Sequence, residues 1–168
     1  MPECMHHLPE RLKTEIALDR AGIGGGAIRA EFDGTTSPDI DVFVFTHELY
    51  VELSSLFGGV SIPGTDDLVS RVTHAGRVIE LVYWDGIHSP EAYLEHVDFD
   101  ISSGMYSGGE YYSVPSFQEA TRTKVMKYLP GADRIPEISY RRYRKYSLRY
   151  GYRMDASIHA LLQAWRNG

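Results

Sequence analysis

The segment 39–45, Asp-Ile-Asp-Val-Phe-Val-Phe, constrains the fold of this chain most strongly. It is short and rich in β-branched and aromatic residues, and both properties are typical of a buried strand. A second run of this kind, Arg-Val-Ile-Glu-Leu-Val-Tyr-Trp at 77–84, is followed directly by an Asp-Gly turn. A third strand-like run lies at 97–101. These runs predict a sheet in the middle of the chain.

Helical patterns lie before and between the predicted strands. The segment 8–21 has apolar residues on one face, and Gly22 is available to end the helix. At 89–91 the sequence Ser-Pro-Glu supplies an N-cap, a first-turn proline and an early acid. This pattern predicts a short helix that continues to His96.

The last third of the chain is predicted to be mostly helical. The Ser-x-x-Glu spacing at 116–119 is that of a capping box and predicts a helix over 117–128. Asp155 is a plausible cap for an apolar stripe that ends at Trp165, which we interpret, like Trp84, as a core anchor. The order of helix, sheet and helices predicts the α+β class.

Composition excludes several classes of protein. The chain has 168 residues and a single cysteine, Cys4, so an internal disulfide framework is excluded. It contains no apolar run near the roughly 20 residues that a membrane span requires. Charged residues occupy the N-terminal stretch where a signal peptide needs an apolar one. We therefore expect a soluble, cytoplasmic protein.

Charge is divided unevenly along the chain, within the overall net charge of −6. Residues 1–120 hold 6 basic and 20 acidic residues, whereas residues 121–168 hold 11 basic and 3 acidic residues. A basic segment of this kind favours contact with a polyanion. The acidic remainder is either a solubilising surface or includes metal-binding carboxylates.

Two aspartates open the first predicted strand. Asp39 and Asp41 are two residues apart, so in a strand both side chains leave the same face and can share a cation. Solvated surface pairs with this spacing are also common. Their position at the start of an apolar strand, ten residues after Arg29 and a glycine cluster, favours a functional pair.

Phosphoryl and nucleotidyl transfer need such a combination, because metal ions and cations must neutralise the charge of the transition state. Two Mg²⁺ ions are the common device, and they usually require a third carboxylate. Glu80 is the candidate because it lies in the middle of the second strand, where an unpaired charge is costly. Asp100 competes for this role, since Asp98 and Asp100 also have D-x-D spacing. Glu80 on a solvated sheet face is the alternative.

Several motifs, in order, resemble the nucleotidyltransferases of the polymerase β type, and within them the bacterial poly(A) polymerases and CCA-adding enzymes (tRNA nucleotidyltransferases). Gly-Gly-Ala-Ile-Arg at 25–29 is similar to their G-G-x-x-R turn, and 39–41 to their metal-binding D-x-D. Glu80 is similar to the glutamate of their next strand, and 98–102 to their R-D-F-T-I-N element. The segment 142–152 resembles the start of their neck helix.

The resemblance implies a fold and a division of the chain. It implies a short mixed sheet backed by helices, with a basic helical C-terminal third. Residues 1–128 would form a nucleotidyltransferase catalytic head, and residues 129–168 a neck-like segment in the same compact unit.

The resemblance also implies roles for individual residues. Asp39 and Asp41 would bind the two Mg²⁺ ions, with Glu80 as the third catalytic carboxylate. The residues expected to bind the nucleoside triphosphate are Gly25, Gly26, Arg29, Asp98, Arg142 and Lys145.

Some positions depart from the pattern of the resembled enzymes. Their aspartate after the arginine is Ala30 here, and the two arginines before their D-F are His96 and Val97. The element that selects the incoming base would fall near Pro136 and Ser139, which cannot do that work. Base choice is therefore not implied.

Cations and tyrosines alternate in the segment 140–150. Arg142, Lys145, Tyr146 and Arg149 would share one helical face, with Arg141 and Arg144 beside it. Cations for phosphates and rings for stacking on bases favour nucleic-acid contact, which we predict for Arg141, Arg144, Tyr146 and Arg149. Packing of the tyrosines on the sheet, with the arginines in water, is the alternative.

The sequence thus predicts an enzyme that transfers a nucleoside monophosphate from a nucleoside triphosphate such as ATP to a hydroxyl group. An RNA 3′ end is the favoured acceptor, as in tRNA processing. One alternative is transfer to a small molecule or a protein. Another is a catalytically inert protein of this fold, of a phage or host-takeover type, that binds nucleic acid or a polymerase.

Overall fold

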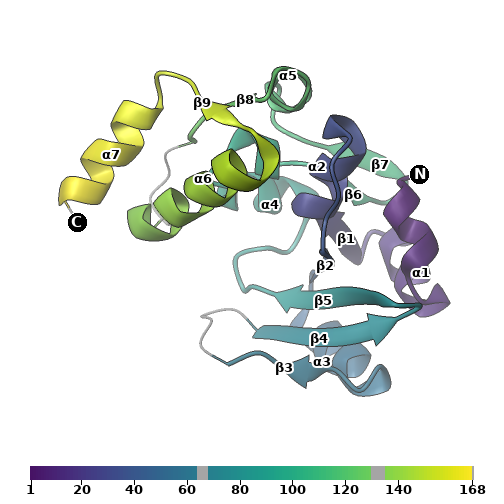
Figure 1. The fold of residues 1–168 in the computed structure, drawn as a ribbon. Coiled ribbons are helices and arrows are strands. Elements are labelled where there is room, and N and C mark those ends of the chain that lie inside the picture. The colour runs from purple at the N-terminus through teal and green to yellow at the C-terminus, as the bar shows by residue number, and fades with distance from the viewer. Residues whose placement is uncertain (64–67, 130–134, 168) are drawn as a thin grey trace.

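The computed structural model describes residues 1–63, 68–129 and 135–167, and within them one large sheet runs through the molecule (Figure 1). Its strands lie in the order β3-β4-β5-β2-β1-β6-β7. They are β1 (Ala21–Gly24), β2 (Asp39–Val44), β3 (Val60–Ser61), β4 (Leu68–His74), β5 (Arg77–Tyr83), β6 (Met105–Ser107) and β7 (Glu110–Tyr112). Two further strands, β8 (Val125–Met126) and β9 (Arg153–Met154), pair with each other in parallel.

The pairing of β2 with β5 is parallel, whereas the other neighbours in the large sheet are antiparallel. The sheet is therefore mixed, as predicted. Asp41 lies directly opposite Glu80 in the β2–β5 register. Because side chains alternate along a strand, Asp39, Asp41 and Glu80 all leave the same face of the sheet.

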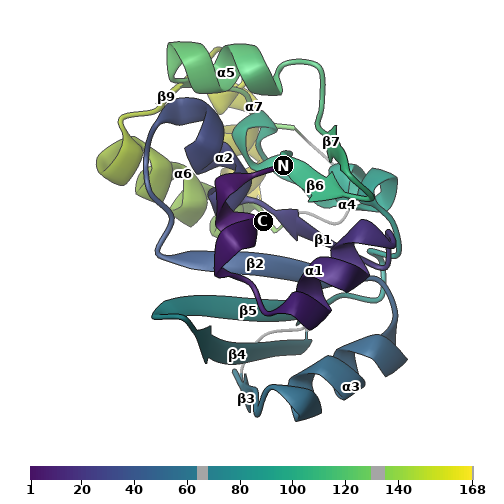
Figure 2. The same cartoon turned by 90° about the vertical axis from the view of Figure 1, so that its right-hand side faces the viewer.

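Helices cover both faces and confirm the α+β class (Figures 1 and 2). The α-helices are α1 (Glu10–Ala17), α2 (Gly26–Asp33), α3 (His47–Leu56), α4 (Pro90–His96), α5 (Phe117–Thr123), α6 (Pro136–Tyr150) and α7 (Ile158–Asn167). Two short 3-10 helices are η1 (Glu3–His7) and η2 (Asp100–Ser102). No helix in the described ranges is both long and apolar enough to cross a membrane.

The main core lies on the face of the sheet opposite the three carboxylates. It combines the inward residues of β2 and β5 with apolar side chains of α1, α2 and α3, among them Ile40, Val42, Ile79, Leu81, Leu12, Ile28 and Leu53. Figure 2 shows α1 lying across this part of the sheet. Burial of the alternate residues of β2 thus fixes which face presents the acidic residues.

A second core connects the C-terminal helices to the rest of the molecule. Phe99, Ile101, Ala120, Met126, Tyr128, Tyr146, Tyr152 and Leu161 are buried together in it. Residues from both sides of the predicted division at 128–129 therefore share one apolar cluster, and α6 is held beside the sheet by this burial.

The predicted helix at 8–21 is wrong at its C-terminal end, because residues 21–24 form β1. Gly22 lies inside this strand and does not end the helix. A Cβ atom there would come 2.8 Å from Sδ of Met105 on β6. Since β1 pairs with β2 on one side and with β6 on the other, long-range hydrogen bonds decide its structure.

The predicted strand at 97–101 is also wrong. Phe99 makes only an isolated bridge to Tyr128, and η2 begins at Asp100. The Asp100 carboxylate accepts hydrogen bonds from the backbone N–H groups of Ile101 and Lys127, both at 2.9 Å. The side chain thus satisfies backbone donors that a strand would have paired with a neighbour.

The predicted helix at 117–128 ends at Thr123. Lys124 has a φ of 59°, in the left-handed region, and the next two residues form β8. The predicted capping box is absent: Ser116 makes no side-chain cap hydrogen bond, and Glu119 pairs with Arg122 instead.

Other predicted features agree with the structure. The two apolar runs form β2 and β5, and Ser89 caps α4 by accepting a hydrogen bond from the N–H of Ala92 at 3.2 Å. The Asp155 carboxylate accepts from the N–H of Ser157, one residue before α7 begins, so it stabilises the turn that precedes the helix, and its role as the helix cap stays a prediction. Trp165, however, is 43% exposed and stacks on Tyr140 at 4.4 Å, so it is not a core anchor.

Gly104→Ala should destabilise the fold. The new Cβ atom would lie 2.7 Å from side-chain atoms of both Ile28 and Phe117, so these two buried side chains would have to shift. We expect a loss of about 1–3 kcal/mol in the free energy of unfolding, measured by urea denaturation. Gly76→Asn is the control, because that site is open and asparagine tolerates its positive φ. Equal stability of the two variants would contradict the close packing at Gly104.

Candidate active site

A cavity of about 370 Å³ lies between the carboxylate face of the sheet and α6. Asp39, Asp41 and Glu80 line it from β2 and β5. Gly25, Gly26 and Arg29 line it from the start of α2, and Arg142, Lys145, Tyr146 and Tyr150 line it from α6. The structure therefore brings together most of the residues that the sequence predicts as catalytic or nucleotide-binding.

Negative charge is concentrated on the sheet side of the cavity. Burial, followed by the charges of Asp39 and Glu80, raises the pKa of Asp41 from its ordinary value of 3.8 to about 7. Arg142 and Lys145 act in the opposite direction. A carboxylate that is kept in such an unfavourable setting is typical of a functional site.

Glu80, and not Asp100, is the third carboxylate of this cavity. Asp100 does not line it, because its carboxylate is occupied by the backbone of residues 101 and 127. Glu80 is held by Arg71, its cross-strand neighbour on β4, whose Nε donates to Oε1 at 3.1 Å.

The arrangement of donors suits a metal ion only in part. Among the described residues, no group of three or more His, Cys, Asp and Glu side chains is arranged to hold a metal ion. Asp39 and Asp41 remain as two hard oxygen donors on one face of β2, which fits the preference of Mg²⁺ for few carboxylates and several waters. Glu80 would have to leave Arg71 in order to join them.

Backbone comes close to the cavity at the start of α2. Gly25, the N-cap residue, has a φ of 63°, and a Cβ atom there would lie 3.5 Å from Oδ2 of Asp41. At Gly26 a Cβ atom would come 2.8 Å from Oγ of Ser37. The glycines therefore leave room beside the N–H groups at the helix N-terminus, where anions bind favourably.

Arg29 supplies a fixed positive charge to the same corner. Its side chain is buried, with 2% of the residue exposed, and its guanidinium lies 4.0 Å from the ring centroid of Tyr150. Within the described residues, Nε and Nη2 have no hydrogen-bond partner, although Nε is 3.3 Å from Oδ2 of Asp33. Buried donors without acceptors are unusual and mark a place where an anion would be stabilised.

Arg142 projects from α6 on the opposite wall and is anchored from behind. Its Nη1 forms an ion pair with Oδ1 of Asp98 at 2.8 Å, and its Nη2 donates to the Tyr146 hydroxyl at 3.1 Å. Asp98 is 3% exposed, does not line the cavity and also accepts a hydrogen bond from Ser139. The contact of Asp98 with the nucleotide therefore stays a prediction, while the structure pairs this carboxylate with Arg142, which lines the cavity.

The predicted nucleic-acid residues separate into two groups. Tyr146 is 7% exposed, lines the cavity and has a hydroxyl that interacts with Ser102 and Arg142. Arg141, Arg144 and Arg149 are exposed on α6 outside the cavity. These three arginines are the predicted residues that lie where an external nucleic acid could reach them, and their role stays a prediction.

Sequence reasoning missed an aromatic end of the cavity. Phe43 and Val82 follow Asp41 and Glu80 at period two, and they line the cavity beside Tyr93 and Trp84. The Trp84 ring lies edge-on to His96, with centroids 4.6 Å apart. The period-two alternation of each strand was the signal that could have placed Phe43 and Val82 there.

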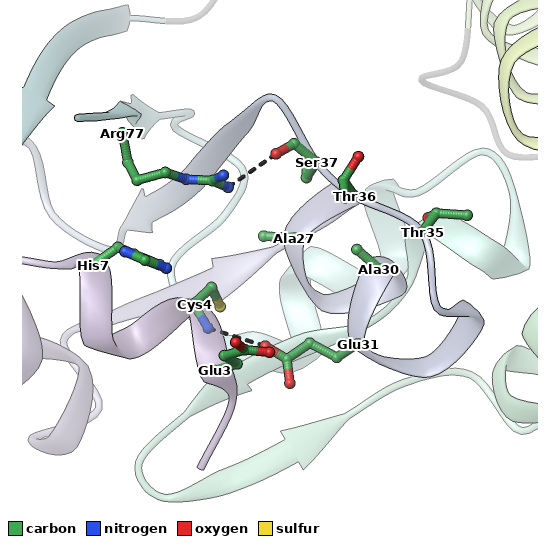
Figure 3. Close-up of a pocket in the computed structure, with 10 residues that line it drawn as sticks. All are labelled: Glu3, Cys4, His7, Ala27, Ala30, Glu31, Thr35, Thr36, Ser37 and Arg77. Atoms are coloured by element: carbon green, nitrogen blue, oxygen red, sulfur yellow. Dashed lines mark hydrogen bonds between the residues drawn. The ribbon is translucent and has the colours of Figure 1, made fainter. Parts of the chain in front are cut away.

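A second, smaller cavity of about 220 Å³ lies on the other side of the loop at 35–38 (Figure 3). Arg77 extends toward the loop and donates to the Ser37 carbonyl at 2.9 Å, and the His7 ring lies on the Cys4 side of Arg77 in Figure 3. Burial, and then Glu31, raises the pKa of Cys4 to about 12, so this thiol is not a nucleophile. Ser37 lines both cavities.

Comparison with solved structures shows what fold this is. The chain is similar to a Thermotoga maritima CCA-adding enzyme complexed with tRNA, with a TM-score of 0.66 and 15% identity. It is also similar to a tRNA nucleotidyltransferase complexed with a primer tRNA and an incoming ATP analog (TM-score 0.67, 19% identity). A tRNA-processing enzyme with CTP gives a TM-score of 0.63 and 21% identity. The predicted resemblance is thus confirmed for the fold.

These matches cover 96%, 93% and 86% of this chain, but only 43%, 49% and 43% of the respective solved chains. This chain therefore spans less than half the length of each of these enzymes. No family model matches the sequence, and no curated protein matches it either.

Asp41→Asn should stabilise the metal-free protein, and more strongly as pH rises. The pKa of Asp41 is higher in the folded protein, at about 7, than its ordinary 3.8, so ionisation of this group lowers stability progressively between these values. In EDTA, we expect the melting temperature of the variant to exceed that of the wild type by an amount that grows up to pH 7 and then levels off. Thermal unfolding followed by circular dichroism measures this. Glu110→Gln, at an exposed position, is the control, and its difference in melting temperature from the wild type should not grow in this way with pH. If the difference for Asp41→Asn does not change with pH, the raised pKa of Asp41 is refuted.

Proposed function

We propose that this protein is a metal-dependent nucleotidyltransferase that transfers a nucleoside monophosphate from a nucleoside triphosphate to a hydroxyl group. The observation that carries the proposal is the composition of the larger cavity. Carboxylates of β2 and β5 line one side of it, whereas buried arginine donors and a glycine-lined helix start line the others. Nucleotidyl transfer needs negative donors for a metal and positive groups for phosphates within one site.

The positive side of the cavity would hold the triphosphate. The backbone at Gly25 and Gly26 would approach the phosphates closely, and Arg29, which lines the cavity, would place its positive charge beside the phosphate oxygens. Arg142 and Lys145 would neutralise the nucleotide or the acceptor from the α6 side. That all of these residues line one cavity supports this assignment.

The negative side of the cavity would hold the metal and accept the proton of the attacking hydroxyl. Asp39 and Asp41 would be the protein ligands of Mg²⁺, which supplies Lewis-acid stabilisation of the transferring phosphoryl group when it is bound. The acceptor oxygen forms a bond to the α-phosphorus, the bond from that phosphorus to the bridging oxygen breaks, and pyrophosphate leaves. Glu80, beside Asp41, would take the proton of the attacking hydroxyl after it exchanges its contact with Arg71.

RNA is the acceptor that we propose. Residues 121–168 carry 11 basic and 3 acidic residues, which is more cation than one nucleotide requires. Arg141, Arg144 and Arg149 are exposed on α6, next to the wall of the cavity. Some of the structurally similar proteins are complexed with tRNA, with CTP or with an ATP analog, which supports nucleotide and RNA partners. The departures near Pro136 and Ser139 leave the added base open.

The variants Asp39→Asn and Asp41→Asn should each lower transfer of labelled nucleotide from α-labelled NTPs to total RNA or tRNA by at least about 100-fold, because each loses a ligand of the Mg²⁺ ion whose charge would stabilise the reacting phosphate. Glu110→Gln, an exposed carboxylate on β7, is the matched control and should leave the rate unchanged. Full activity of Asp41→Asn would refute the metal assignment. Absence of transfer and of NTP binding in the wild type would instead favour an inert nucleic-acid-binding protein. Transfer to a small molecule or to protein, and not to RNA, would refute the RNA acceptor alone.

The double variant Arg144→Gln/Arg149→Gln should weaken binding of a single-stranded RNA without changing binding of the NTP. Each lost phosphate contact reduces the slope of log K against log salt by about 0.7 for a single strand, so two lost contacts should reduce it by about 1.4. Fluorescence anisotropy at several salt concentrations measures the slope. Arg122→Gln, an exposed cation on α5, should leave the slope unchanged. An unaltered slope in the double variant would place the RNA elsewhere.

A further inference from the structure

Asp33, the last residue of α2, lies at a junction of three separate parts of the chain. Its side chain is 0% exposed. Oδ2 is 3.1 Å from Nζ of Lys124, which follows α5, and accepts a hydrogen bond at 2.6 Å from the hydroxyl of Tyr152, which follows α6. The same Oδ2 is 3.3 Å from Nε of Arg29, four residues earlier in α2.

The other carboxylate oxygen is held by the loop that leads to β2. Oδ1 accepts hydrogen bonds from the backbone N–H and the side-chain hydroxyl of Thr35. Burial acts to raise the pKa of Asp33, but the hydrogen bonds from Thr35, Tyr152 and Lys124 outweigh it and the pKa is lowered. The group is therefore a permanently negative and orientationally fixed carboxylate.

This carboxylate determines how Arg29 can be placed. Residues four apart lie on the same side of a helix, so Asp33 can reach the Nε edge of the guanidinium. The ring of Tyr150 covers the group at 4.0 Å, and Tyr146 lies 5.5 Å from it. With Nε beside Asp33 and a flat side against Tyr150, the guanidinium is held at the wall of the cavity that Arg29 lines. Its buried Nη2 has no hydrogen-bond partner in the described structure.

We infer that Asp33 is a positioning residue for nucleotide binding: it fixes the guanidinium of Arg29 so that this group meets the phosphates of the incoming nucleoside triphosphate. The inference rests on the proposed function. It also connects the phosphate corner with the C-terminal part of the chain, because the same carboxylate binds Lys124 before β8 and Tyr152 before β9.

A purely structural role for Asp33 makes different predictions from a positioning role. A structural clamp would change the melting temperature, but it would not change how the folded protein binds a nucleotide. A positioning residue acts through Arg29, so its removal should change the KM for the NTP and should have no further effect once Arg29 is lost.

The test compares Asp33→Asn with Tyr152→Phe in the full chain, by calorimetric binding of Mg·ATP and by steady-state transfer to RNA. Asn keeps the size of the side chain but loses its charge, so we expect the Kd and the KM for ATP to rise about tenfold, with a smaller fall in kcat. Tyr152→Phe removes a hydrogen bond from the same carboxylate but keeps the charge next to Arg29. It should lower the melting temperature and leave the KM within about twofold.

A double-mutant cycle gives the second measurement. In an Arg29→Met background, Asp33→Asn should have no further effect on the Kd for Mg·ATP. The positioning role would be overturned if Asp33→Asn raised the Kd by the same factor in the Arg29→Met background as in the wild type. It would also be overturned if Asp33→Asn left the Kd unchanged. Either result would leave the proposed function intact. If the wild type binds none of the four NTPs with Mg²⁺, the proposed function fails, and the inference fails with it; if it binds another NTP and not ATP, that NTP replaces ATP in every measurement.

Thr35→Val keeps the inference testable if Asp33→Asn does not fold. This substitution removes the hydroxyl that holds Oδ1 and lets the carboxylate rotate away from Arg29. It should raise the Kd for Mg·ATP about twofold to threefold, because the lost binding free energy should be only a part of the net contribution of one hydrogen bond. A lower melting temperature with an unchanged Kd would overturn the inference.

Discussion

Repulsion between carboxylates on one face of a sheet is the constraint on which the rest of this structure depends. The parallel register of β2 and β5 sets Asp41 directly beside Glu80, and burial raises the pKa of Asp41 further. Like charges at this spacing cost free energy unless cations face them. The cations come from α2 and α6 and from the neighbouring strand β4, so the position of those elements is tied to the charge of the sheet face.

Two buried carboxylates keep the main cations in place. Asp98 pairs with Arg142 on α6, and Asp33 lies beside Arg29 on α2. A buried ion pair contributes little net stability, because the loss of hydration offsets the attraction. Each pair instead fixes the position of an arginine: one part of the guanidinium lies against a carboxylate, while the residue lines the cavity. The two pairs serve the same purpose on opposite walls.

Local sequence was sufficient to predict the parts of the site that lie on two strands and one turn. The period-two spacing of Asp39 and Asp41, the central position of Glu80 and the glycines before Arg29 are all local properties, and the structure places these residues in one cavity. The failures were in features that depend on distant contacts. Residues 21–24 become a strand because β2 and β6 flank them, and residues 97–101 are shaped by the backbone donors that Asp100 accepts.

The roles of Asp33, Asp98 and Tyr146 were beyond sequence reasoning for the same reason. Each acts on a partner that is brought to it by packing of the C-terminal helices: Tyr152 on Asp33, Arg142 on Asp98, and Ser102 on Tyr146. Ala30, directly after Arg29, led us to expect a missing carboxylate, but adjacent residues in a helix do not face each other. Asp33, one helical turn later, lies beside the arginine instead, and the resembled G-G-x-x-R motif does not include this position.

The separation of charge along the chain has a physical meaning in the folded molecule. The acidic residues of β2 and β5 and the basic residues of α6 come from opposite parts of the sequence, and they meet only at the cavity. The site therefore does not exist until the second core, which includes Tyr146, Tyr152 and Leu161, has docked α6 beside the sheet. A ligand that bridges both walls would bind only the docked form, so by mass action its binding would stabilise that docking. Folding of the C-terminal third and assembly of the candidate site are then one event.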